Sequence, residues 1–599
     1  MPFKADVNQL KEEDPEFYQF LLDNDKELLT SDESDMSEEE EMETKVTIKQ
    51  QMKNLGPQTI KSITKTFKKC FEDGDFNLDS TESFEELTNC VFVDCVAFIK
   101  NELNLENIFS NYSSHKKYFK YKNAIKNIVS CFIHFLESQP CDQSLEDEHT
   151  IENPLMVVVL SQSSHVIQLA YAFPALLKKI IKQSALIFGK SRSIMMKAKG
   201  LAVVKLVVHA RSGRDLYNDT KSVDKNLLEL AIKLLYKTYL EHSRQVHENN
   251  LTMISFMSQS IVSELCGIDL ETTYSLAYQF LRQIANLTRL AYDNKIEKKV
   301  HHVYGWSCLQ AMRLWSQFIC KYAIKSATLL NAIKSINDKR VIHSKVGNQA
   351  NMLIYPYVQL CHAILQLQPT PRYFPFKFHL LALMIDINQS TDTMVPVMHY
   401  LVEVVQSIQQ CKNPTVKAIE FNTTIRASKQ HLSTQSYQES LVEKCHDLFI
   451  KAIAVHSNKI YFPDWICPMQ KILRQLLQKS TNKKSKQMLQ HVLKSIEQSK
   501  QSMLEKRKSV KFGPCDLDLI LQFESNLPKD TPMEKLVENI SNIEARVVPV
   551  VNAEEVAKSN RDEIMKDKVE PLALSDDESP SVIPVKRTKM NKKQKRVKQ

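Results

Sequence analysis

Histidine and cysteine are the side chains that most often bind metals or act as nucleophiles, and the sequence places such residues side by side at two points. His301 is followed by His302, and Cys445 is followed by His446. Both pairs lie in segments with helical spacing of apolar residues, where adjacent side chains point to different faces. Shared metal ligation is therefore not expected, and we interpret Cys445 and His446 as parts of an ordinary amphipathic helix.

Other catalytic signatures are missing from the sequence. It contains no GxxxxGK[ST], HExxH, GxSxG or CxxC motif, and its nine glycines never form the GxG of a dinucleotide site. No spacing singles out a catalytic carboxylate. We therefore expect no enzyme activity, no cofactor, no metal and no small-molecule substrate.

The cysteines and the longest apolar runs indicate the compartment. The thirteen cysteines are scattered, and the closest pair, Cys90 and Cys95, is separated by four residues. The first ten residues have no apolar stretch, so we expect reduced, mostly buried thiols in a reducing compartment. The most apolar runs, which begin at Pro154 and Val166, are shorter than the ~18 apolar residues that a membrane helix requires. No membrane partner is predicted.

Prolines and apolar stripes predict an all-α protein. Pro356, Pro375 and Pro396 each precede a stripe of apolar residues at helical spacing, and proline is favoured in the first turn of a helix. These three prolines are separated by 19 and 21 residues, and Pro154 and Pro174 are separated by 20. Two helices and their turns would occupy about 40 residues, the period of HEAT-like repeats. The expected fold is an all-α, HEAT/armadillo-like solenoid with each helix presenting one wide apolar face.

Charge and composition set the expected boundaries. The formal net charge of the chain is +9. Because residues 11–43 hold 15 acidic and 2 basic residues, the rest of the chain carries a net charge of about +22. We expect four parts: an acidic, mostly disordered region at 1–55, a helical lead-in at 56–140, the repeat body at 150–510, and an extended tail at 511–599. A basic body with flexible charged ends suits a polyanionic partner.

A strongly basic helix pair is predicted near the end of the body. Residues 470–511 contain 12 basic and 2 acidic residues around two apolar stripes, which are Ile472, Leu473, Leu476 and Leu477, then Met488, Leu489, Val492, Leu493 and Ile496. One interpretation is a solvated lysine-rich face, and another is a face that docks a protein. The third is an RNA-phosphate contact, made by Lys471, Arg474, Lys483, Lys484, Lys486 and Lys494.

The two ends of the chain carry further candidate sites. A carboxyl-terminal cluster is typical of nuclear localisation or nucleic-acid binding; it consists of Lys586, Arg587, Lys589, Lys592, Lys593, Lys595, Arg596 and Lys598. Ser37 and Ser575 lie in acidic segments and are candidates for phosphorylation.

A short helix is expected over residues 14–29. Asp14 can cap it and Pro15 can begin it, and its apolar anchors are Phe17, Phe20, Leu21, Leu28 and Leu29. Such a short helix is marginal alone. It either packs on its own body or inserts into a groove of a partner protein.

Four blocks of sequence, in order, resemble the nucleolar complex protein 2 family. They are DPEFYQFLLDNDKELL with the acidic run behind it, YGWSCLQAMRLWSQF from Tyr304, the block YPYVQLCHAILQLQPTPRYFPFKFHLLALMI from Tyr355, and the block from Phe421 to Trp465. The similarity covers about residues 230–510 and the first thirty. The sequence departs from the family at Gly305, where asparagine is expected, and at FPDW in place of FPEL.

The resemblance implies an assembly factor for the large (60S) ribosomal subunit in the nucleus, both nucleolus and nucleoplasm. It implies a HEAT- or armadillo-like fold without enzymatic activity. The implied partners are nucleolar complex proteins 1 and 3 and pre-60S particles with their pre-rRNA, whose intranuclear transport it would support. The lysine-rich leader that the resemblance implies before the DPEF element is nearly absent, so we expect the carboxyl-terminal cluster to act as the import signal.

Two other functions are compatible with the residues. A nuclear transport receptor is also a helical solenoid, although import receptors are usually acidic and this body is basic. A chromatin or histone regulator would use the acidic tract of residues 32–43 to bind histones.

Overall fold

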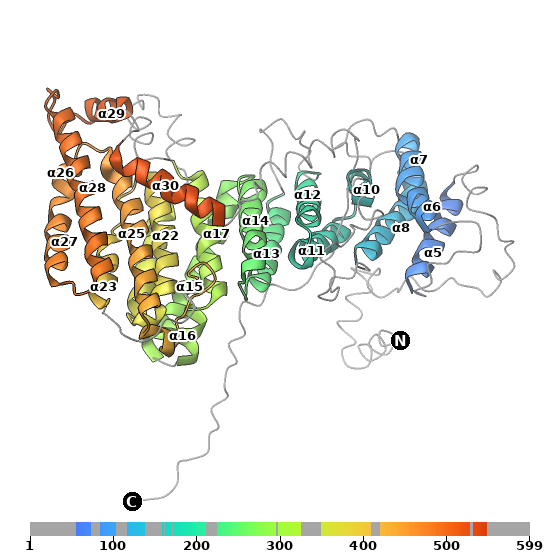
Figure 1. Cartoon of the computed structure of the whole chain (residues 1–599). Helices are drawn as coiled ribbons and strands as arrows, with labels where there is room; N and C mark the ends of the chain where they lie inside the picture. Colours follow the sequence, from blue (N-terminus) through green and yellow to red (C-terminus); the bar gives the residue numbers. More distant parts are fainter. Residues whose placement is uncertain are drawn as a thin grey trace, which may run out of the picture. The chain divides into compact units, whose positions relative to one another are not determined.

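A computed structural model describes residues 56–72, 84–103, 117–137, 159–160, 162–170, 172–210, 224–294, 297–324, 349–408, 420–527 and 531–547. Contacts divide the chain into two units, residues 1–59 and 60–599. Residues 56–59 are the described part of the first unit, and all other described residues belong to the second. Every regular element in these ranges is a helix, as predicted, and none is a β-strand (Figure 1).

The helices before residue 225 form the amino-terminal part of this unit. They are α5 (Pro57–Glu72), α6 (Phe84–Asn89), the π-helical turn η1 (Cys90–Asp94), α7 (Cys95–Glu102), α8 (Tyr118–Glu137), α10 (Ser163–Ala170), α11 (Pro174–Lys190) and α12 (Ile194–Ala210). An aromatic cluster joins three of them, because Phe92 of η1 packs edge-on against Phe67 of α5 and Phe132 of α8.

The remaining helices follow in two stretches. The first consists of α13 (Lys225–His242), α14 (Glu248–Ile261), the π-helical turn η2 (Val262–Cys266), α15 (Leu270–Asn294), α16 (Glu297–Val303), α17 (Trp306–Tyr322), α20 (Gln349–Met352), α21 (Ile354–Leu367), the short 3-10 helix η3 (Pro371–Tyr373), α22 (Phe374–Thr391) and α23 (Met398–Ser407). The second consists of α24 (Lys429–Leu432), α25 (Gln435–Ser457), α26 (Phe462–Trp465), α27 (Cys467–Lys479), α28 (Lys483–Arg507), α29 (Leu517–Asn526) and α30 (Pro532–Val547).

The prolines begin helices as the sequence predicts. Pro174 and Pro375 lie in the first turns of α11 and α22, and Pro356 is the third residue of α21. Pro396 precedes α23 by two residues, and Pro154 lies outside the described residues. The missing N–H of proline costs nothing in a first turn.

The prediction of one apolar face for each helix is wrong for α22. Residues all around this helix are buried, and they include Phe376, Lys377, Leu380 and Met384. The reason is that α22 packs against α17, α21 and α25, so no side of it faces solvent over most of its length. Its one buried charge is matched, since Nζ of Lys377 lies 2.9 Å from Oε2 of Glu403.

Helices also pack against the next helix but one along the chain. α11 contacts both α12 and α13, and α13 contacts α15. Helix α25 contacts helices that are farther away in the sequence, namely α22, α28 and α30. The last contact places α30 within the folded unit. The structure therefore differs from the expected tail boundary at residue 511, because α29 and α30 both lie beyond it.

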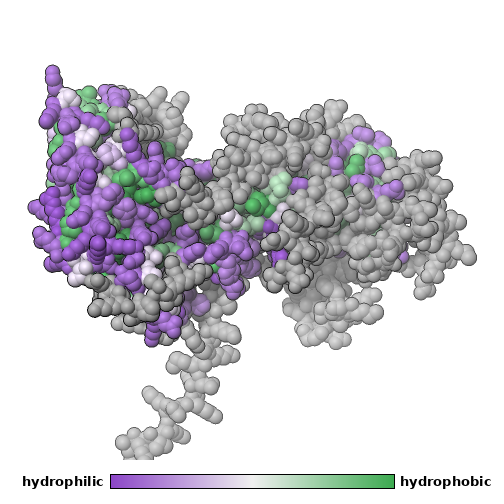
Figure 2. Space-filling view, viewed as in Figure 1, coloured by the Kyte–Doolittle hydropathy of each residue, from purple (hydrophilic) through white to green (hydrophobic). Residues whose placement is uncertain are grey.

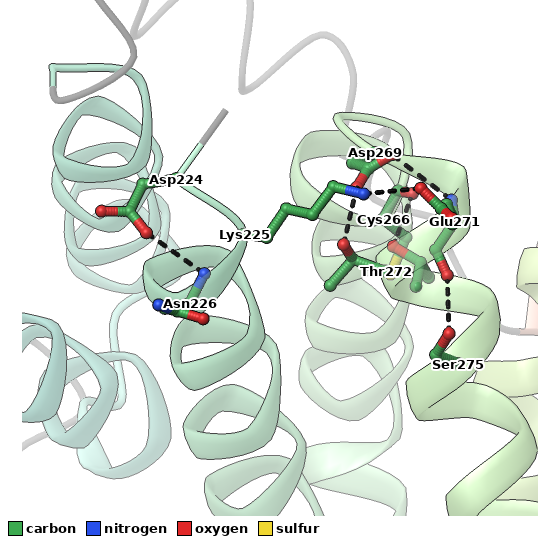
Figure 3. Close-up of polar contacts among 9 residues, drawn as sticks. Asp224, Lys225, Asn226, Cys266, Asp269, Glu271, Thr272 and Ser275 are labelled. Carbon is green, nitrogen blue, oxygen red and sulfur yellow. Dashed lines mark hydrogen bonds and ion pairs between the residues drawn. The ribbon is translucent and has the colours of Figure 1, made fainter. Parts of the chain in front are cut away.

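The start of α13 is tied to the start of α15 by polar contacts (Figure 3). Asp224 caps α13 by accepting hydrogen bonds from the backbone N–H groups of Asn226 and Leu227. Lys225 then donates to Glu271 of α15 over 2.5 Å, and this hydrogen bond raises the pKa of Lys225. The pair is exposed, so it orients the two helix ends more than it stabilises the fold.

Candidate nucleic-acid interface

The predicted basic helix pair is present as α27 and α28. Leu473 and Leu476 of α27 are buried, as are Met488, Leu489, Val492 and Ile496 of α28. The expected stripe is wrong at Ile472, which is 38% exposed, because this residue lies at the margin of the face that packs on α28. Leu477 and Leu493 are half-buried.

Asn482 sets the start of α28. Its side-chain oxygen accepts hydrogen bonds from the backbone N–H groups of Lys484 and Ser485, at 2.9 and 3.4 Å. These are two of the N–H groups that have no partner inside a helix. A three-residue turn between α27 and α28 therefore ends at a defined residue, and the lysines that follow occupy fixed positions on the helix.

All six basic side chains expected to contact phosphate are exposed. On α28, Lys483, Lys486 and Lys494 are spaced by three and eight residues, which places them on one side of the helix. The rise of an α-helix gives about 16 Å between the first and the last. We call these three residues the lysine ladder. Hydrophilic residues predominate over the region of α23 and α25–α28 in Figure 2, with smaller hydrophobic patches between them.

Two of the six are engaged within the chain, which the sequence did not indicate. Lys484 donates to Glu439 of α25 over 2.6 Å and lies 3.7 Å from Glu443. The hydrogen bond raises the pKa of Lys484 and lowers that of Glu439. Arg474 lies 3.6 Å from Glu497. Lys471 and the lysine ladder form no ion pair with any described residue, so they are the stronger candidates for phosphate contact.

A histidine pair lies between α25 and α28. Nε2 of His446 is 2.9 Å from Nδ1 of His491, and Asp447 lies 3.3 Å from the other ring nitrogen of His446. Burial, helped by the neighbouring His446 and Lys494, lowers the pKa of His491. Cys445, the residue before His446 in α25, is buried, and burial raises its pKa. Sequence reasoning named His446 but not its partner, because the contact joins residues 45 positions apart.

The described part of the chain shows no cluster of metal ligands and no membrane-spanning helix. In the described ranges, no three His, Cys, Asp or Glu residues gather in a way that could hold a metal ion. His301 and His302 are both exposed at the end of α16. Among the helices that the structure describes, none combines the length and apolar character that crossing a bilayer requires.

Four other sets of predicted sites lie outside the described residues. They are the helix over residues 14–29, Ser37, Ser575 and the carboxyl-terminal basic cluster.

Comparison with known proteins identifies the family. The family model described as Noc2p family matches residues 226–540, which is more than half of the chain. The chain belongs to the Noc2p family. The matched range begins at the second residue of α13 and ends within α30, and it contains the α27–α28 pair.

Relatives in three organisms cover most of the chain. It is 23% identical to Nucleolar complex protein 2 of Drosophila melanogaster, over 89% of this chain and 74% of that protein. It is 21% identical to Nucleolar complex-associated protein 2 of Arabidopsis thaliana, over 95% and 77% respectively. An uncharacterized NOC2 family protein of Schizosaccharomyces pombe is 22% identical, over 89% and 74%.

The two places where the resemblance predicted other residues, Gly305 and the FPDW stretch, lie at the starts of helices. Gly305 is the N-cap residue of α17, with φ of −108°, and N-cap positions accept both asparagine and glycine. Asp464 in FPDW accepts a hydrogen bond from Arg507 of α28 over 2.9 Å. Gly305 and Asp464 therefore both fit the local structure at these helix starts.

Proposed function

We propose that this Noc2p-family protein is a non-enzymatic assembly factor for the large (60S) ribosomal subunit. It acts in the nucleolus and nucleoplasm, binds nucleolar complex proteins 1 and 3, and supports the intranuclear transport of pre-60S particles. It contacts pre-rRNA through phosphates. The proposal is supported by membership of the Noc2p family and by the names of its relatives.

The proposed RNA contact rests on the exposure and the arrangement of the lysine ladder. Three exposed lysines on one side of α28 hold no described carboxylate, so their charges are available to a polyanion. Lysines that neutralise phosphates release counterions and do not read sequence. Lys471 lies on the adjacent helix α27 and adds a fourth charge. A particle rich in folded RNA matches this surface.

We further propose a HEAT/armadillo-like solenoid for the helical body. The packing of helices against the next but one, as α11 against α13 and α13 against α15, supports this arrangement. Such a body offers long surfaces to several partners. We take its limits as about residues 150–547, which extends the boundary expected from sequence to include α30.

The two ends of the chain have separate roles in this proposal. The helix over residues 14–29 docks into a groove of a partner protein, and the cluster from Lys586 to Lys598 directs nuclear import. Phosphorylation at Ser37 and Ser575 adds charge to acidic segments that already repel anions.

Purification of the tagged full chain from its host cells tests the assembly function. We expect large-subunit precursor rRNA and two nucleolar complex proteins to co-purify at moderate salt. Recovery of histones or of a Ran-type GTPase without ribosomal precursors would instead support one of the other two functions and would reject this one.

Charge reversal on the lysine ladder tests the RNA contact. The triple variant K483E/K486E/K494E should crosslink less to pre-rRNA, and its binding to RNA should depend less on salt, by about 0.7 in log–log slope for each lost phosphate contact. Far-UV circular dichroism should not change. K484E is the matched control: it breaks the pair with Glu439, so it should lower stability more than RNA binding. Equal effects of the two variants on RNA would contradict the assignment.

A further inference from the structure

Helix α8 exposes an aromatic ring that none of the described residues covers. Phe119 is 78% exposed, the largest exposed fraction of the large apolar side chains in the described part of the chain. Its neighbours Tyr118 and Tyr121 are buried, and with Ile125, Ile128 and Phe132 they anchor the other face of α8 in the core. The backbone under Phe119 is therefore held firmly. A single exposed ring is common, so its surroundings decide whether it has a role.

The surroundings of Phe119 are strongly basic. Between Glu106 and Glu137 the sequence has five lysines and no acidic residue. Lys122 and Lys126 follow Phe119 by three and seven positions, which places all three on one side of the helix, together with Asn123. All of them are exposed, and so is Lys120 at the flank. We call Phe119, Lys120, Lys122, Asn123 and Lys126 the α8 face.

Two of these lysines are available to an anion. Neither Lys120 nor Lys122 forms an ion pair with a described residue, whereas Lys117 just before α8 is bound to Glu102 over 3.0 Å. The pKa of Glu102 is lowered mainly by its hydrogen bond with Lys117, and the charge of Lys120 adds to this effect from a longer distance. The ammonium of Lys120 lies 5.4 Å from the ring centre of Tyr121, which holds it along the surface.

The combination of a ring and lysines distinguishes this surface from the lysine ladder. The ladder has no aromatic side chain among its three lysines, so it can contact phosphates of any RNA. An exposed ring adds a platform on which an unpaired base can stack, and such stacking needs a base that is not in a duplex. An amphipathic helix that binds membranes would offer an apolar face to lipid, but the apolar face of α8 is already buried in the protein.

We propose that the α8 face binds single-stranded RNA, with a base stacked on Phe119 and the flanking phosphates on Lys120 and Lys122. This inference rests on the proposed function, since it adds a second RNA contact to the same protein. The face lies outside the range matched by the Noc2p family model, so it would be a contribution of the amino-terminal helices.

Fluorescence anisotropy with the purified full chain tests the inference. The probes are a labelled uridine-rich single strand of about 12 nucleotides and an RNA duplex of equal length. Measurements are made with the wild-type lysine ladder and with K483E/K486E/K494E, so that the ladder does not mask the α8 face. F119A should raise the Kd for the single strand about tenfold and leave the Kd for the duplex unchanged. F119W should restore the single-strand affinity.

The lysines are tested by K120Q/K122Q, which should weaken binding to both probes and reduce the salt slope by about 0.7 for each lysine. Unchanged single-strand binding by F119A, an equal loss for both probes, or a lowered melting temperature of F119A would overturn the inference. Binding to anionic phosphatidylserine vesicles that depends on Phe119 would overturn it as well. If wild-type protein binds single strands regardless of Phe119, only this inference fails; if it binds no RNA at all, the proposed RNA contact also fails.

Discussion

Tyr304 shows how one side chain can join helices that are distant in the sequence. It lies between α16 and α17 and is almost fully buried. Its hydroxyl donates to the carbonyl of Ile364 over 2.7 Å and accepts from the backbone N–H of Gln368 over 3.1 Å. Both groups lie at the end of α21, where helical carbonyls lack partners. The hydroxyl of Tyr304, in the YGWSC block, thus bonds to the backbone at the carboxyl end of a helix 60 residues away.

Replacing Tyr304 by phenylalanine should lower the free energy of unfolding by about 1–3 kcal/mol, because the buried carbonyl of Ile364 and the partly buried N–H of Gln368 both lose their partner. Urea denaturation followed by circular dichroism measures the change. Tyr355→Phe is the control, since Tyr355 is 74% exposed and its loss should cost less than about 0.5 kcal/mol. Similar costs for both variants would show that the buried hydroxyl is not needed.

Lys197 of α12 introduces a pH dependence. It is fully buried, and its Nζ donates to the carbonyls of Phe188 and Gly189 at 2.7 and 3.0 Å, at the end of α11. Burial lowers the pKa of Lys197 to about 7, from 10.5 in an exposed lysine. Between these values the unfolded chain binds the proton and the folded chain does not. The contribution of Lys197 to the free energy of unfolding therefore increases as the pH rises from 7 to 10.

The variant K197M should lack this rise. We expect the difference in unfolding free energy between the wild type and K197M to shift in favour of the wild type from pH 7 to pH 9, as measured by urea titrations at each pH. Taking the difference cancels the contributions of tyrosines and cysteines that titrate higher. A difference that does not change with pH would mean that the pKa of Lys197 is not lowered in the folded protein.

At the residue scale, the sequence predicted that the six basic side chains of α27 and α28 are exposed but not what they contact. The exposure of Lys471, Arg474, Lys483, Lys484, Lys486 and Lys494 followed from the apolar stripes between them. The pairing of Lys484 with Glu439 could not follow, because α25 and α28 meet only in the folded chain. The sequence likewise gave no reason to expect that Lys197 and Lys377 are buried, since lysines are usually exposed.

Among the helices, α11 and α13 approach closely at a glycine. A β-carbon at Gly189 would lie 2.9 Å from the β-carbon of Thr238, and both atoms would be fixed by helical backbone. Gly189→Ala should therefore push the two helices apart. The loss from overpacking, about 1–3 kcal/mol, exceeds the gain of up to about 1 kcal/mol in helix propensity.

Thermal unfolding measures this effect, and Gly189→Ala should lower the midpoint. Gly513→Ala serves as the control, because its β-carbon would meet only Asp516 at 3.8 Å. A midpoint of the Gly189 variant equal to that of the wild type would show that α11 can shift without loss of packing.

Local signals predicted the helices well where proline or a stripe marks them. Pro174, Pro356 and Pro375 lie in helical starts because their ring is compatible with a first turn. The cap at Asn482 and the all-round burial of α22 were not predicted, since the first needs the turn geometry and the second depends on three packed neighbours. The π-helical turns η1 and η2 left no recognisable pattern in the sequence.

For the whole molecule, the separation of charge predicts separate routes for import and for RNA binding. Deletion of residues 586–598 should reduce nuclear accumulation of a fluorescent fusion, because this segment holds eight basic residues in a short stretch. The helix content of the body should not change. Microscopy of living cells measures the ratio of nuclear to cytoplasmic signal.

The control for the deletion is K483E/K486E/K494E, which should enter the nucleus normally and yet bind RNA less. If the ladder variant stays in the cytoplasm and the deletion variant does not, the import signal lies in the body. The all-α class, the basic body and the family all followed from the sequence, whereas the docking of α30 on α25 and α28 required the folded structure.

The reactivity of the buried thiols can report how often individual helices open transiently. Seven of the eleven described cysteines are buried, and none of the eleven forms a disulfide; the buried ones range from Cys70 in α5 to Cys445 in α25. A maleimide reagent can alkylate such a thiol only when its helix swings open. Mass spectrometry of alkylated peptides would therefore rank the helices by how often they open, starting from the exposed Cys515, and without a single engineered probe.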